Sequence, residues 1–105
     1  MALTYVCSPL SAPTRAEMLA NAAKASTYMM KAEQEFGNRA VAPHAYLPFL
    51  LDDTAPEERA LALEFGQKLL AMCTRLVVYG DRISSGMSAE IMKAEELGLS
   101  LIHIS

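Results

Sequence analysis

Apolar runs alternate along the chain with segments of helical periodicity. The runs rich in β-branched residues predict strands at Leu3–Cys7, Arg39–Ala42, Arg75–Tyr79 and Leu99–Ile104. Apolar residues spaced by three or four positions predict helices over Arg15–Phe36, Pro56–Cys73 and Gly86–Leu97. The segment His44–Leu51 is apolar but interrupted by Pro48, so we expect a loop with a short helical turn. This alternation predicts an α/β fold: a three-layer sandwich with helices on both faces of a mostly parallel sheet of four or five strands.

Local signals mark the ends and faces of these helices. Thr54 with Glu57 predicts a capping box before the second helix, and Ser84 or Ser85 is the expected N-cap of the last. Gly37 and Gly98 are expected to end the first and last helices. The apolar faces predicted to pack inward are Leu19, Ala22, Ala23, Met29 and Met30 on the first helix and Leu61, Phe65, Leu69 and Met72 on the second.

Composition narrows the class of protein. A chain of 105 residues with 52 % apolar content suits one domain, residues 1–105, with a substantial core. Its net charge of −3 and lack of a Lys/Arg run disfavour nucleic-acid binding. We expect no membrane span and no signal peptide, hence a cytoplasmic protein, that of a bacterial host if the protein is phage-encoded.

Signals for metals and cofactors are missing from the sequence. Cys7 and Cys73 stand alone, which is typical of buried thiols in a reducing compartment. Two distant histidines without clustered carboxylates predict no metal site. The chain has no GxGxxG or Walker loop, and we expect no cofactor.

Glu90 is the strongest candidate for chemistry. On a helical projection it lies within the apolar arc of Met87, Ile91 and Ala94, whereas Glu95 and Glu96 lie outside. A carboxylate on a buried face is costly unless a partner stabilises it, and this one lies near a helix N-terminus that follows a strand. The alternative is a solvated carboxylate at the edge of the helix.

Loops that follow parallel strands meet at one edge of the sheet. We therefore expect one pocket to gather Ser8, Ser11, Arg15, His44 and the turn and helix start formed by Gly80, Asp81, Arg82, Ser84, Ser85, Gly86 and Met87. The free N–H groups of Gly86–Ser88, two serine hydroxyls and Arg82 suit a phosphate. An ordinary capped helix with an exposed arginine is the alternative, and His44 is equally compatible with a plain loop residue.

Three motifs, YVCSPLS, APH and GDRISSGMSAEIMKAEELG, resemble those of the nucleoside 2-deoxyribosyltransferase-like proteins, above all short, often phage or prophage members of unassigned function. The resemblance covers nearly the whole chain. It implies a small Rossmann-like or flavodoxin-like sandwich that acts on the N-glycosidic bond of deoxynucleosides or their 5′-monophosphates. It makes Glu90 the nucleophile and Tyr5 a contact of the reacting centre, with His44 beside the base and Ser84 and Gly86 at the phosphate.

The chain departs from the enzyme pattern at two positions. Ser11 stands where the monophosphate hydrolases have an arginine, and Gly66 where they have an aspartate that contacts sugar and base. The rival function is therefore a non-catalytic module that binds a nucleotide or sequesters a nucleotide signal, as in phage; an assembly protein that keeps only the fold is a third. The resemblance also implies a homodimer or larger homo-oligomer, because the family builds its sites at subunit contacts.

Overall fold

The computed structural model describes residues 2–10, 12–52, 55–80 and 82–104. Its elements, in chain order, are β1 (Leu3–Cys7), α1 (Arg15–Phe36), β2 (Arg39–Val41), the 3-10 helix η1 (Pro43–Ala45), α2 (Leu47–Leu50), α3 (Pro56–Ala71), β3 (Arg75–Tyr79), α4 (Ser85–Leu97) and β4 (Ser100–Ile104). Every predicted strand and helix is present. The segment expected to be a loop with one helical turn folds as η1 and α2.

The four strands form one parallel sheet in the order β2-β1-β3-β4. The α/β prediction is therefore confirmed, with a Rossmann-like arrangement. After β1 the chain moves to one side of the sheet for β2, and after α3 it crosses to the other side for β3. Such a reversal leaves a crevice at the carboxyl ends of β1 and β3, where open α/β sheets bind ligands.

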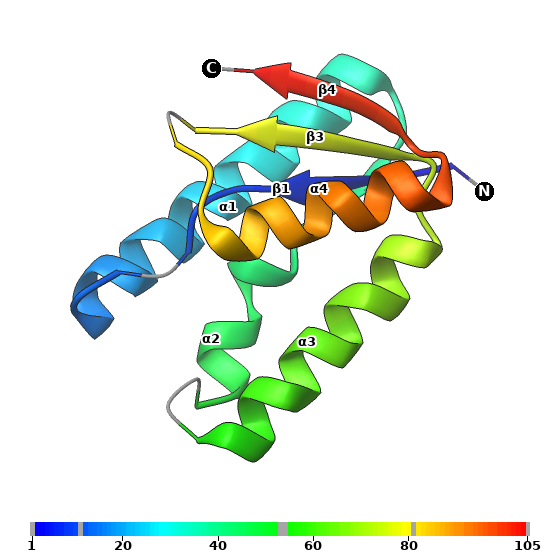
Figure 1. Ribbon diagram of the computed structural model, residues 1–105. Coiled ribbons are helices and arrows are strands. Elements are labelled where there is room, and N and C mark those ends of the chain that lie inside the picture. The colour runs from blue at the N-terminus through cyan, green and yellow to red at the C-terminus, as the bar shows by residue number, and fades with distance from the viewer. Residues whose placement is uncertain (1, 11, 53–54, 81, 105) are drawn as a thin grey trace.

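Helices cover both faces of the sheet (Figure 1). Behind it, Ala25 and Ala32 of α1 pack against the side chains of β1 and β3 that point to this face, such as Val6 and Val77. In front, α4 and the C-terminal end of α3 bury a second cluster that includes Tyr5, Leu70 and Met87. The strands alternate between the two layers, because successive side chains point to opposite faces.

Most of α3 lies away from the sheet (Figure 1), and this corrects one prediction. Within the predicted inward stripe, Leu61, Phe65 and Met72 are 54 %, 47 % and 64 % exposed, and Leu70 is the buried residue of the helix instead. On α1 the predicted Met30 is likewise 59 % exposed, and the buried residues of that helix are the small Ala22, Ala25 and Ala32. Among the described residues, no neighbour covers these three side chains of α3 fully, and each stays about half exposed or more.

The helix ends follow the sequence signals closely. Gly37 (φ 71°) and Gly98 (φ 78°) end α1 and α4 in the left-handed conformation that glycine adopts most easily. The N-cap position of α3 is Ala55, which makes no side-chain cap, and the predicted cap Thr54 lies outside the described residues. Both cysteines are buried and free, as predicted. Among the described helices, none has the length and apolar character needed to cross a membrane.

Candidate functional site

A cavity of about 330 Å³ opens at the carboxyl edge of the sheet, between η1, α2, α3 and α4. Six of the candidate site residues named from the sequence line it: Tyr5, His44, Ser84, Ser85, Gly86 and Glu90. Gly66 lines it as well. The six come from β1, η1 and the start of α4, so the fold brings together segments that are far apart in the chain. The apolar part of the wall includes Leu47, Leu51 and Leu70.

Glu90 is held on the inward side of α4. One turn earlier, Met87 is fully buried, and Glu90 follows it toward the sheet with a side chain that is 18 % exposed. Its Oε2 atom is buried and has no hydrogen-bond partner among the described residues. Burial raises the pKa of this carboxyl, while the nearby His44 and a hydrogen-bonding interaction with Tyr5 lower it, and burial prevails. By contrast, Glu95 and Glu96 are exposed, as predicted.

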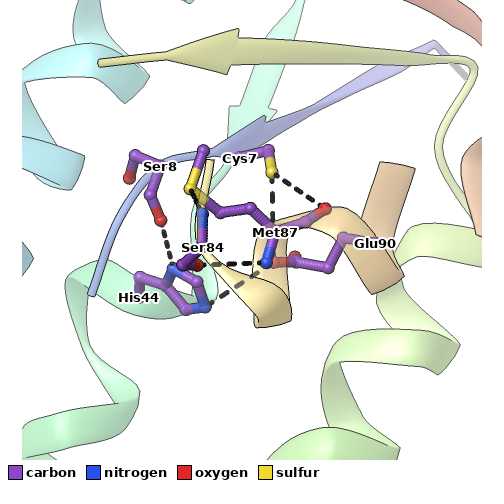
Figure 2. A network of polar contacts seen from close by, with 6 residues as sticks. All are labelled: Cys7, Ser8, His44, Ser84, Met87 and Glu90. Carbon is purple, nitrogen blue, oxygen red and sulfur yellow. Dashed lines mark hydrogen bonds and ion pairs between the residues drawn. The ribbon is translucent and has the colours of Figure 1, made fainter. Parts of the chain in front are cut away.

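His44 lies between β1 and Glu90 (Figure 2). Its Nδ1 atom is 2.9 Å from the carbonyl oxygen of Ser8, and its Nε2 atom is 3.8 Å from Oε1 of Glu90. A carbonyl oxygen only accepts hydrogen bonds, so Nδ1 carries a hydrogen and donates it. The imidazole is therefore fixed in orientation, with Nε2 directed at the carboxylate.

Tyr5 forms the floor of the cavity from the middle of β1. It is 2 % exposed, and a Cβ atom at Gly66 would lie 3.5 Å from its hydroxyl oxygen, so this helical glycine leaves room beside the phenol. Burial first, and then the charge of Glu90, raise the pKa of Tyr5. The phenol therefore stays protonated and serves as a hydrogen-bond donor.

Cys7 lies next to the carboxylate of Glu90. Its Sγ atom is 4.0 Å from Oε1 of Glu90 and 3.9 Å from the carbonyl oxygen of Met87 (Figure 2). Burial, and then the charge of Glu90, raise the pKa of this thiol. The thiolate, which is the reactive form of cysteine, is therefore disfavoured at this position.

The start of α4 forms one wall. Ser84 is the N-cap: its Oγ accepts a hydrogen bond from the backbone N–H of Met87 at 3.2 Å, and its own N–H donates to the sulfur of Met87 at 3.5 Å. This confirms one of the two predicted caps. It also turns the Met87 side chain into the core, so this predicted contact residue does not line the cavity.

Other predicted contact residues lie elsewhere. Gly80 and Arg82 line a second hollow of about 110 Å³ with residues of α1, such as Lys24. Arg15 donates from Nη2 to the carbonyl oxygen of Pro48 at 3.2 Å and so contacts α2. The hydroxyl of Ser8 is buried without a hydrogen-bond partner among the described residues, and only its carbonyl serves the site. The expectation of a single pocket is thus corrected, because Gly80 and Arg82 line the hollow beside α1 while Ser84 lines the main cavity.

Two predicted residues, Ser11 and Asp81, lie outside the described residues. Four polar residues of the wall were not predicted: Glu58, Arg59 and Gln67 on α3 and Lys93 on α4. Lys93 lies one helical turn after Glu90, which is a signal that the sequence contains. The residues of α3 carry no such signal, because periodicity does not show which neighbour a helix faces. No group of three or more potential metal ligands occurs among the residues that the structure describes.

Comparison with known proteins supports the fold. A solved 2-deoxyribosyltransferase from the psychrotolerant bacterium Bacillus psychrosaccharolyticus matches 97 % of this chain and 71 % of its own, with a TM-score of 0.69 and 17 % sequence identity. The resemblance expected from the sequence is therefore confirmed in the fold. A sequence search of curated proteins finds no match. Residues 2–104 match a family described as a domain of unknown function, and the chain accordingly belongs to that family, DUF7768.

Proposed function

We propose that this protein binds a nucleoside or nucleotide in the cavity and breaks or transfers its N-glycosidic bond, with Glu90 as the nucleophile. One observation carries the proposal: Glu90, whose side chain is 18 % exposed, lines the cavity, and its buried oxygen Oε2 has no hydrogen-bond partner among the described residues. An unsatisfied buried acceptor destabilises a fold and is typical of functional sites. A volume of about 330 Å³ also suits a small-molecule ligand.

The surrounding groups support this chemistry. A carboxylate that attacks the anomeric carbon forms a covalent glycosyl-enzyme, which water then hydrolyses or a second base intercepts. The protonated phenol of Tyr5 is placed to orient the carboxylate or the sugar. The start of α4, with Ser84, Ser85 and Gly86, offers a helix N-terminus to a phosphate, and the cations Arg59 and Lys93 line the same cavity.

Gly66 favours a second candidate function, binding without turnover. It stands in the cavity wall beside the Tyr5 hydroxyl, where the resembling hydrolases carry an aspartate. A site without that carboxylate lacks one group for protonating the leaving base. Under this alternative the ligand is recovered intact, and Glu90→Gln leaves its affinity largely unchanged.

We also propose that a second copy of the chain covers α3. The stripe formed by Leu61, Phe65 and Met72, here called the α3 stripe, is about half exposed or more. Leu63, 59 % exposed, lies about 200° around the helix from Leu61 and lines the cavity, so the α3 stripe is on the face of α3 that points away from the site. Burial of such apolar side chains is the usual driving force for a symmetric dimer.

The test is release of free base from a panel of deoxynucleosides and their 5′-monophosphates, followed by chromatography. We expect release by the wild type, loss in Glu90→Gln, and retention in the matched control Glu95→Gln, an exposed carboxylate of the same helix. Release that survives Glu90→Gln contradicts the catalytic proposal. If no substrate releases base but a nucleotide raises the Tm and is recovered unchanged, the binding function holds instead.

A further inference from the structure

We propose that His44 carries the proton of the reaction: it donates from Nε2 to the departing base and takes a proton back from the attacking water. This inference rests on the proposed function and extends it, because it names the group that replaces the aspartate absent at Gly66. Three observations carry it. The imidazole of His44 is fixed in orientation, Glu90 lies next to its Nε2 atom, and Oε2 of Glu90 has no hydrogen-bond partner among the described residues.

The first step concerns which nitrogen of His44 can bind and release a proton. With Nδ1 donating to the Ser8 carbonyl, a neutral His44 presents a bare lone pair at Nε2. That lone pair lies 3.8 Å from Oε1 of Glu90, so a neutral imidazole beside an ionised carboxylate places two acceptors face to face. A proton held at Nε2 would face the carboxylate, and because Nδ1 is engaged by Ser8, Nε2 is the nitrogen that can exchange a proton with a ligand in the cavity.

The second step concerns the two carboxylate oxygens. Oε1 faces His44 and the thiol of Cys7, whereas Oε2 has no hydrogen-bond partner among the described residues. Oε1 is therefore the oxygen nearest the His44 imidazole. The attack is assigned to Oε2, which no described group holds and which the side chain must turn into the cavity, because this atom is buried in the structure. When Oε2 becomes part of an ester, the negative charge that faces Nε2 is lost, which favours transfer of the Nε2 proton to the departing base.

The two half-reactions balance. In the first, an electron pair of Oε2 forms the bond to the anomeric carbon, the C–N bond pair leaves with the base, and the Nε2 proton passes to that base. In the second, a water oxygen bonds to the same carbon, its proton passes to Nε2, and the ester bond breaks to restore the carboxylate. His44 keeps its Nδ1 hydrogen bond to Ser8 throughout. A second base with an N–H proton replaces water in a transfer reaction.

A comparison of leaving groups tests the proposal. An N7-methylated 2′-deoxyguanosine is already cationic, so its base departs without a proton, whereas ordinary 2′-deoxyguanosine needs one. Both are used as nucleosides or as 5′-monophosphates, whichever form the wild type accepts. With enzyme in excess, a single turnover isolates the first half-reaction from the second.

We expect His44→Gln to slow base release from the ordinary substrate by about 10²- to 10⁴-fold, the range typical of a lost general acid. Release from the methylated substrate should stay within about tenfold of wild type, and the glycosyl-enzyme should then accumulate, because its hydrolysis lacks a base. The control His103→Gln changes the other histidine, which is exposed on β4, and should leave both rates unchanged. Equal slowing on both substrates would show that His44 only positions Glu90, and the proposal would be overturned.

The wild type alone supplies a second test should His44→Gln fail to fold. Single-turnover release from the ordinary substrate should decline at high pH, because that step consumes a proton supplied by the protein, whereas the methylated substrate should show no such decline. Other ionisable groups near the pair affect both substrates alike: Tyr5 and Cys7 on β1, Arg15 on α1, Glu58 and Arg59 on α3, and Glu90 and Lys93 on α4. Matching declines overturn the role of His44, whereas failure of the wild type to release either base overturns the proposed function itself.

Discussion

At the scale of single residues, the candidate site holds a carboxylate, Glu90, at a position where burial destabilises the fold. Glu90 is mostly buried and has one unsatisfied oxygen, while Tyr5 and Cys7 beside it are kept protonated by burial. A carboxylate in such a place costs folding free energy unless its partners compensate for lost hydration. The raised pKa of Glu90 shows that His44 and Tyr5 compensate only in part.

This has a measurable consequence for stability. Because burial raises the pKa of Glu90 in the folded state, the folded protein binds this proton more tightly than the unfolded chain. The carboxyl therefore costs nothing below its unfolded pKa, about 4.3, and destabilises the fold increasingly as pH rises through the folded value. Glu90→Gln should raise the Tm at neutral pH, and the gain should vanish near that lower limit.

Thermal unfolding of both proteins across pH measures this difference. The control Glu95→Gln, exposed on the same helix, should show no pH-dependent gain. A Tm difference between wild type and Glu90→Gln that does not change with pH would mean that Glu90 is as well solvated when folded as when unfolded.

At the scale of elements, the sequence predicted what local chemistry determines. The ends of α1 and α4 follow from Gly37 and Gly98, and Ser84 caps α4 through its own hydroxyl. The helical projection of α4 placed Glu90 inside and Glu95 outside, because period and burial agree there. For α3 the same projection gave a wrong inward stripe, since which neighbour a helix faces depends on tertiary contacts.

Two glycines should respond in opposite ways to alanine. Gly66 lies within α3, where a Cβ meets only the Tyr5 hydroxyl at 3.5 Å, an ordinary contact. Gly66→Ala should therefore raise the free energy of unfolding by about 1 kcal/mol. Gly98 has φ 78°, so Gly98→Ala should lower it by about 1–2 kcal/mol.

Chemical denaturation measures both values, and each variant serves as the control for the other. A loss of stability in Gly66→Ala would show that the space beside Tyr5 tolerates no side chain. That result would also mean that an aspartate, which the resembling hydrolases carry at this position, does not fit beside Tyr5 in this chain.

At the scale of the whole molecule, the sheet order places the site and α3 leaves it partly open. The cavity lies at the carboxyl edge of the sheet, where the strand order reverses. The edge could be expected from the β-α alternation alone, whereas the strand order could not. The sequence did not predict that residues of the β3–α4 turn line two different hollows. Gly80 packs against Pro9, and Arg82 lines the hollow on the α1 side. The contributions of Arg59 and Gln67 also depend on how α3 is placed.

The α3 stripe leads to a prediction about assembly. If a second copy covers it, Leu61→Glu should shift the protein from dimer or larger to monomer, because a charge would be buried at the contact. Met30→Glu is the matched control, since Met30 is 59 % exposed on α1 and should leave assembly unchanged. Light scattering after size exclusion measures the mass, and a wild type that is monomeric at high concentration contradicts the prediction.

The intact mass of the protein, acid-quenched during turnover of a deoxynucleoside, tests the role of Glu90 most directly. We predict a population heavier by one deoxyribosyl group, attached to the peptide that contains Glu90 and absent from Glu90→Gln. Base release with no adduct at any time after mixing, or an adduct on another residue, would contradict a mechanism built on this carboxylate.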